Sequence, residues 1–120
     1  MQTAWIALAG AIGALARYRI GVAIGLRSFP WATLSVNVAG SFLLAFILAG
    51  AATSRWSPAT TAAVAVGLLG SFTTFSTFGY ETFTLLRTGR GHFAAAYVLL
   101  SLLGGLAATA LGYVAGRSLT

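Results

Sequence analysis

The chain has 120 residues, of which 58% are hydrophobic and 7% are charged, and its mean hydropathy is +0.91. Soluble domains carry about 25% charged residues, so this composition excludes a soluble globular protein and predicts that lipid surrounds most of the chain. There is no cysteine, and His92 and Glu81 are the only histidine and the only acidic residue, which excludes thiolate chemistry, carboxylate pairs and Ser-His-Asp triads and argues against an enzyme. The arginines are scattered and form no basic stripe of the kind that binds nucleic acid.

Four apolar stretches run along the chain, at about residues 3–26, 31–53, 59–86 and 93–116. A crossing of the hydrocarbon core takes about 20 residues, so each stretch is long enough to span a membrane. We therefore expect an all-α, multi-pass integral protein of the inner or plasma membrane, with a single domain of four transmembrane helices. Gly21 with Gly25, and Gly112 with Gly116, have the spacing that lets helices approach closely in lipid.

The arginines near the span ends give little preference for one orientation. Arg55 and Arg117 would lie on one side of the membrane, and Arg27, Arg87 and Arg90 on the other. Orientation follows the excess of positive charge in short loops, so a bias this weak allows insertion in both senses.

The first span contains Arg17 and Arg19. Either side chain could extend along its helix to the interface, because long basic side chains keep their charged ends in water. An arginine that faces a water-filled vestibule would instead attract anions, as basic rings do in anion pores. The sequence leaves both interpretations open.

The second span contains Asn37, the only asparagine of the chain, with Ser35 and Ser41 nearby. Its amide offers two donors that suit an anion, and polar groups inside membranes tend to mark transport pathways. The alternative is a hydrogen bond that joins two helices. We favour a role in transport.

The third span carries an unusual polar and aromatic run over residues 67–79. Threonine and glycine both lower helix stability, so the run predicts a break in the helix, with backbone carbonyls that could bind a hard cation. In an unbroken helix these hydroxyls would bond back to carbonyls one turn earlier. Phe75 and Phe78 share a helix face, and the positive edges of their rings could contact a desolvated anion, although packing is the ordinary role of phenylalanine.

Glu81 lies near the end of the third span, close to Arg87. We expect it to pair with an arginine or to cap a vestibule, and a proton relay is the alternative. In the fourth span Tyr97, Ser101 and Thr109 lie four and eight residues apart, which places three hydroxyls on one helical stripe.

These residues resemble a known family, the small fluoride channels of the Fluc (CrcB-like) type. The resemblance covers essentially the whole chain and rests on residues 13–18, 33–41 and 70–78, followed by Glu81. Two positions depart from the family pattern, because Gly105 stands where a further serine can occur and Ser71 where a second glycine is common.

The resemblance implies an antiparallel, dual-topology homodimer with two passive pores that export fluoride and thereby lower its cytoplasmic concentration. It also implies a structural sodium ion on the dimer axis, held by the backbone carbonyls of Gly70 and Thr73. The anion pathway that we expect comprises Arg17, Asn37, Phe75, Ser76, Thr77, Phe78, Tyr97, Ser101 and Thr109.

Two other classes of membrane protein share the size of this chain. A small dual-topology multidrug transporter would carry a membrane-embedded glutamate in its first helix, and this chain has none there. A scaffold subunit without transport activity is the second alternative.

Overall fold

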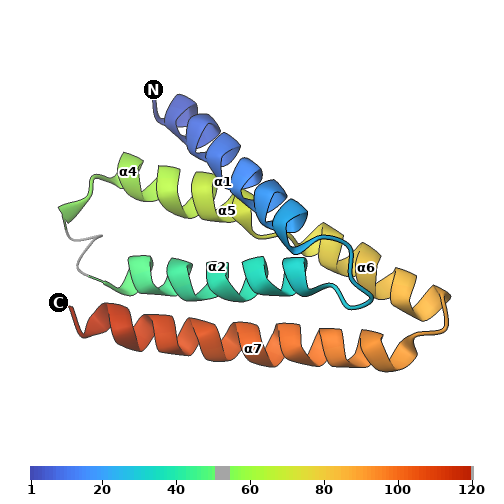
Figure 1. Ribbon diagram of the computed structural model, residues 1–120. Coiled ribbons are helices and arrows are strands. Elements are labelled where there is room, and N and C mark those ends of the chain that lie inside the picture. Colours follow the sequence, from blue (N-terminus) through green and yellow to red (C-terminus); the bar gives the residue numbers. More distant parts are fainter. Residues whose placement is uncertain (51–54, 120) are drawn as a thin grey trace.

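The computed structural model describes residues 1–50 and 55–119, and every secondary-structure element in these ranges is a helix. The expected end of the second span, at Thr53, and the first residue of the loop after it, Ser54, lie outside the described residues. The helices, shown in Figure 1, are α1 (Gln2–Ile24), α2 (Trp31–Ala49), α4 (Pro58–Ala62), the π-helical segment η1 (Ala63–Leu69), α5 (Gly70–Phe72), α6 (Phe75–Arg87) and α7 (Gly91–Arg117).

Four helical stretches are long and apolar enough to cross a membrane, with mean hydropathies of 1.4 to 1.9. They are α1, α2, the composite segment Pro58–Arg87 that includes α4, η1, α5 and α6, and α7. The prediction of four apolar helices in an all-α protein is therefore confirmed. The start of α1 and the end of α7 lie at the same end of the bundle (Figure 1), as an even number of crossings requires.

Helix ends differ by a few residues from the expected spans. We expected the first span to reach Leu26, but α1 ends at Ile24 because Gly25 adopts φ 75°, a conformation that suits glycine and stops a helix. The third span begins at Pro58, where the Ser57 hydroxyl accepts from Thr60 N at 3.2 Å and caps the helix.

Helices α2 and α7 pack side by side along most of their length (Figure 1). A methyl group at Gly112 would overlap the carbonyl oxygen of Phe42, and one at Gly116 would overlap that of Phe46. The close approach predicted for this glycine pair is confirmed. At Gly21 and Gly25 no such approach occurs within the described chain, since no neighbouring atom of it lies within 4 Å of a methyl group built there.

Helix α1 crosses the third span and packs on η1 and α5 (Figure 1). The crossing depends on two other glycines. Gly13 lies against Leu68 and Ser71, and Gly67 approaches the backbone of Ile6, so a side chain at either glycine would push the two helices apart. Small residues thus set this helix contact also.

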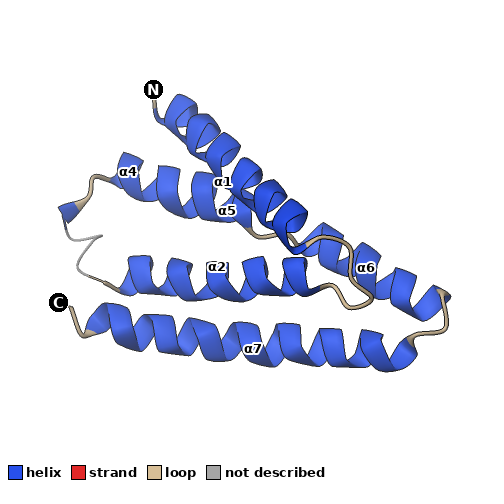
Figure 2. Ribbon diagram, in the orientation of Figure 1, coloured by secondary structure: helices blue, strands red, loops and turns tan. Residues whose placement is uncertain are grey.

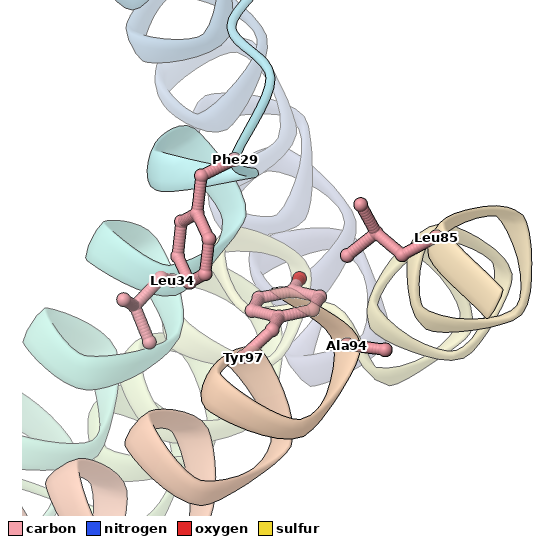
Figure 3. Close-up of a cluster of buried hydrophobic side chains, with 5 residues drawn as sticks. All are labelled: Phe29, Leu34, Leu85, Ala94 and Tyr97. Atoms are coloured by element: carbon pink, nitrogen blue, oxygen red, sulfur yellow. The ribbon is translucent and has the colours of Figure 1, made fainter. Parts of the chain in front are cut away.

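A buried apolar cluster joins the loop after α1 to α2, α6 and α7 (Figure 3). Its members are Phe29, Leu34, Leu85, Ala94 and Tyr97. Elsewhere few residues are fully buried, between 6% and 22% of the most apolar stretch of each span, and the rest are half-buried or exposed. A surface of this kind belongs in contact with lipid or with further protein.

Candidate functional site

The third span changes backbone conformation between α5 and α6 (Figure 2). Helix α5 ends at Phe72 and α6 begins at Phe75. The two residues between them have extended dihedral angles, φ −88° and ψ 159° at Thr73 and φ −152° and ψ 119° at Thr74. We call Thr73 and Thr74 the interruption.

Thr74 caps the helix that follows the interruption. Its hydroxyl oxygen accepts from Thr77 N at 3.2 Å, and the hydroxyls of the two threonines are 3.0 Å apart. An extended residue whose side chain accepts from the amide three residues later is the favoured start of a helix. The run of threonines therefore begins a new helix in the middle of the span.

Asn37 of α2 bonds to both polar backbone groups of Thr74. Its Oδ1 accepts from Thr74 N at 2.8 Å, and its Nδ2 donates to Thr74 O at 3.0 Å. The helices can approach closely here because Gly40 faces Thr73, whose side chain leaves no room for a methyl group. Asn37 therefore makes a helix-to-helix contact, and one of its two amide hydrogens remains for another acceptor.

Arg17 of α1 contacts the other side of the interruption. Its Nε donates to Ser71 O at 3.1 Å, and the hydroxyl of Ser71 donates to Gly10 O at 2.7 Å. Arg17 is partly buried and does not simply extend toward the interface, whereas Arg19 is exposed. The guanidinium thus stabilises a carbonyl next to the point where the helix ends.

The carbonyls of Gly70 and Thr73 lose their usual helical donors. In a continuous α-helix the amides of Thr74 and Thr77 would bond to them, but those amides donate to Asn37 Oδ1 and to Thr74 Oγ1. Gly70 and Thr73 line an open groove of about 270 Å³ between α2 and the third span, together with Asn37 and Phe75. Two carbonyl oxygens at this groove suit a hard cation.

No group of three or more histidine, cysteine, aspartate or glutamate side chains gathers within the described ranges. A cation here would therefore take backbone oxygens and not side-chain ligands. One chain supplies the two carbonyls of Gly70 and Thr73, fewer than the six or more oxygens that hard cations such as calcium take in proteins.

A second, larger groove of about 460 Å³ is lined by residues of α1, α2 and the third span, Thr74 among them. Arg17, Thr33, Thr74 and Glu81 bring charge and hydroxyls to its walls, and the other lining residues are Tyr18, Gly21, Val22, Gly25, Leu26, Ala32 and Val36. It holds both a cationic and an anionic side chain, so its field is not that of a purely basic vestibule.

Glu81 has a tyrosine as its partner. The Tyr97 hydroxyl donates to Glu81 Oε1 at 2.8 Å, and Thr33 lines the same groove as Glu81. Tyr97 has no exposed surface and points into the cluster between α2 and α6 (Figure 3). The expected pairing of Glu81 with an arginine is not found within residues 1–50 and 55–119, and Glu81 instead lines the larger groove.

Aromatic rings connect the interruption with this buried tyrosine. The ring centroids of Phe75 and Phe78 are 5.8 Å apart, and those of Phe78 and Tyr97 are 5.0 Å apart at an edge-to-face angle of 62°. Phe29 continues the series at 5.7 Å from Tyr97. Phe75 is 83% exposed although it lies at membrane depth, so its ring is open to lipid or to another protein surface.

The remaining predicted residues are dispersed. Ser76 is exposed, and the Ser101 hydroxyl is buried without a hydrogen-bond partner in the described part of the chain. Thr109 is also exposed, and its hydroxyl donates to Gly105 O at 2.8 Å within its own helix. The hydroxyls of Tyr97, Ser101 and Thr109 on α7 therefore have different surroundings, because the first bonds to Glu81, the second has no partner in the described residues and the third bonds within its own helix.

Two residues of the site, Thr33 and Ser71, were not among the predicted positions. Thr33 lies one turn before Asn37 on α2, and that spacing could have placed it on the same face. Ser71 gave no comparable indication, because its hydroxyl bonds to α1, 61 residues away in sequence.

Comparison with known proteins finds one matching family and relatives that all carry the same kind of name. The family described as "CrcB-like protein, Camphor Resistance (CrcB)" matches residues 4–113. A protein of Desulfitobacterium hafniense named fluoride-specific ion channel FluC 1 is 48% identical over 84% of this chain and 90% of its own length. Proteins named fluoride-specific ion channel FluC in Magnetococcus marinus and Geobacter sulfurreducens are each 46% identical, over 98% and 95% of both chains, respectively.

Proposed function

Since this chain belongs to the CrcB-like family, we propose that it is a passive fluoride channel that lets fluoride leave the cell and so lowers its cytoplasmic concentration. The family is one of ion channels and not of enzymes, and the four apolar helices make this chain a multi-pass protein of the cell membrane. The observation that carries the proposal is the interruption of the third span, where polar groups from three helices meet at membrane depth.

The anion pathway that we propose follows the interruption. Fluoride holds its hydration water strongly, so a pore must replace that water with donors. The second amide hydrogen of Asn37 and the hydroxyls near Thr74 are such donors, and the ring edges of Phe75 and Phe78 offer partial positive charge in a narrow apolar passage. Arg17 adds a full positive charge at the larger groove.

We propose that Tyr97 and Ser101 continue the pathway along α7, with Thr109 further along the same helix. Ser101 has a buried hydroxyl that still needs an acceptor, and a permeating anion or a water would supply one. Ser76 and Thr77 lie between the two phenylalanines and complete the set of hydroxyls near the passage.

A second copy of the chain completes the pore in this proposal. Phe75 and the groove beside Gly70 are open in the single chain, and the weak arginine bias allows two copies to insert in opposite senses. An antiparallel homodimer would close these surfaces with two-fold symmetry. The carbonyls of Gly70 and Thr73 from both copies would then hold a sodium ion, whose charge offsets part of the cost of burying an anion nearby.

The proposal is tested by reconstituting the purified chain alone in liposomes loaded with fluoride. A potassium ionophore lets potassium leave with the anion, so that no membrane potential builds up to stop the efflux, and a fluoride electrode follows the release. Matched vesicles loaded with chloride serve as the control. We expect rapid release of fluoride and negligible release of chloride. Vesicles that release no more fluoride than empty ones would favour a scaffold subunit, and drug transport without fluoride release would favour a multidrug transporter.

A further inference from the structure

The amide of Asn37 is matched to one residue of the interruption. It accepts from the backbone N–H of Thr74 and donates to the carbonyl of the same residue, at 2.8 and 3.0 Å. The contact gives the Thr74 N–H an acceptor that no helical carbonyl provides, and it adds a donor to the Thr74 carbonyl, which as the N-cap of α6 also accepts the first bond of that helix. It spans 37 positions of sequence and joins α2 to the third span.

This contact competes with the helix itself. In an unbroken α-helix the N–H of Thr74 would donate to the carbonyl of Gly70, four residues earlier. An amide that lacks a partner in hydrocarbon is costly, so without Asn37 the nearest remedy for Thr74 is to close that helical bond. Closing it would move Thr74 from its present φ of −152° to helical dihedral angles and would occupy the Gly70 carbonyl.

We infer that Asn37 is a positioning residue that keeps the third span interrupted at Thr73 and Thr74, in addition to donating to an anion. The inference rests on the proposed function only for its consequence in transport, because the conformation of Thr74 can be measured without any flux. Its two roles use different atoms. Oδ1 and one amide hydrogen hold Thr74, and the second amide hydrogen is the one available to fluoride.

Two substitutions separate these roles. Asn37→Asp keeps an oxygen that accepts from Thr74 N–H, the bond that competes with the Gly70 carbonyl, but it loses both amide hydrogens and places negative charge beside the anion path. Asn37→Ala removes the contact with Thr74 altogether. Ser35→Ala is the matched control, since Ser35 is exposed two residues before Asn37 on α2 and its hydroxyl donates to Trp31 O at 2.6 Å within its own helix.

The measurement is the carbon chemical shifts of Thr73 and Thr74 in threonine-labelled protein in lipid nanodiscs, because these shifts distinguish extended from helical backbone. We expect extended shifts in the parent, in Asn37→Asp and in Ser35→Ala, and helical shifts for Thr74 in Asn37→Ala. Fluoride release from liposomes should be lost in both Asn37 variants and retained in Ser35→Ala.

Extended shifts at Thr74 in Asn37→Ala would overturn the inference and leave Asn37 as an anion donor alone. A parent chain that shows the extended shifts but releases no fluoride would instead contradict the proposed function while leaving the inference intact. If Asn37→Ala does not fold, the test uses the parent protein. The measurement is then the nuclear Overhauser effect between the Thr74 amide proton and the Asn37 side-chain amide, which we expect to observe. Absence of that contact would likewise overturn the inference.

Discussion

The hydrogen bond between Tyr97 and Glu81 can be measured separately from the packing around it. Substituting Tyr97 with Phe removes the hydroxyl that donates at 2.8 Å but keeps a ring of the same shape, so the edge contacts with Phe29 and Phe78 at 5.7 and 5.0 Å persist. Glu81→Met removes the acceptor but keeps a side chain of similar length. A double-mutant cycle with both changes isolates the coupling between the two groups.

The expected coupling free energy follows from the surroundings of the bond. Hydrogen bonds to charged groups contribute about 1.5–3 kcal/mol, whereas hydrogen bonds between helices in membranes average about 0.6 kcal/mol. Tyr97 is fully buried, but Glu81 lines an open groove that admits water. We therefore expect a coupling of about 1–2 kcal/mol, between the two values.

The assay is the free energy of unfolding in mixed micelles, measured for the parent, Tyr97→Phe, Glu81→Met and the double variant. Tyr113→Phe is the control, because Tyr113 lies on the same helix and is 53% exposed, and it should change stability by less than about 0.5 kcal/mol. A coupling below about 0.3 kcal/mol, within the error of additivity, would refute the assignment of Tyr97 as the partner of Glu81.

Three further changes test other parts of the structure. Phe75→Ile and Phe78→Ile keep apolar bulk but remove the ring quadrupole, so each should strongly lower fluoride release while the protein still purifies as a dimer. Fluoride release at the parental rate in both variants would show that the two rings contribute only packing. Gly112→Val should destabilise the α2–α7 contact by about 1–3 kcal/mol, because its side chain would overlap the carbonyl of Phe42. Gly105→Ala is the control, because a methyl group at Gly105 would lie 3.8 Å from its nearest neighbour, the Ser41 hydroxyl oxygen. Equal losses of stability in both variants would contradict this packing. Replacing sodium by a bulky organic cation should lower the dimer fraction in gel filtration, and an unchanged fraction would count against a sodium site.

Local patterns in the sequence predicted a good part of the fold. Apolar length alone predicts four helices, because the hydrocarbon core imposes a minimum span. The spacing of Gly112 and Gly116 likewise predicts a close helix contact, and the backbone of α2 lies against both. These features depend on residues close to one another in the chain, which is why they can be read directly.

Contacts between distant segments could not be predicted in the same way. The threonine run marks Thr73 and Thr74 as poor helix residues. Nothing near them in sequence indicates that the Asn37 side chain would bond to both the N–H and the carbonyl of Thr74. Glu81 lies closer in sequence to Arg87 than to Tyr97, yet it bonds to Tyr97, because α7 returns alongside α6. The sequence analysis also did not predict the π-helical segment η1, which packs against the distant helix α1.

The proposal stands or falls on whether this protein, with no other protein present, forms a passive and fluoride-selective pathway. The most direct measurement is the reversal potential of the current through a planar bilayer that holds the purified protein, with a tenfold fluoride gradient and equal chloride on both sides. Passive fluoride conduction predicts reversal at the fluoride equilibrium potential, about 59 mV from zero. Reversal near zero, or a reversal potential that follows a proton gradient imposed across the same bilayer, would contradict the account.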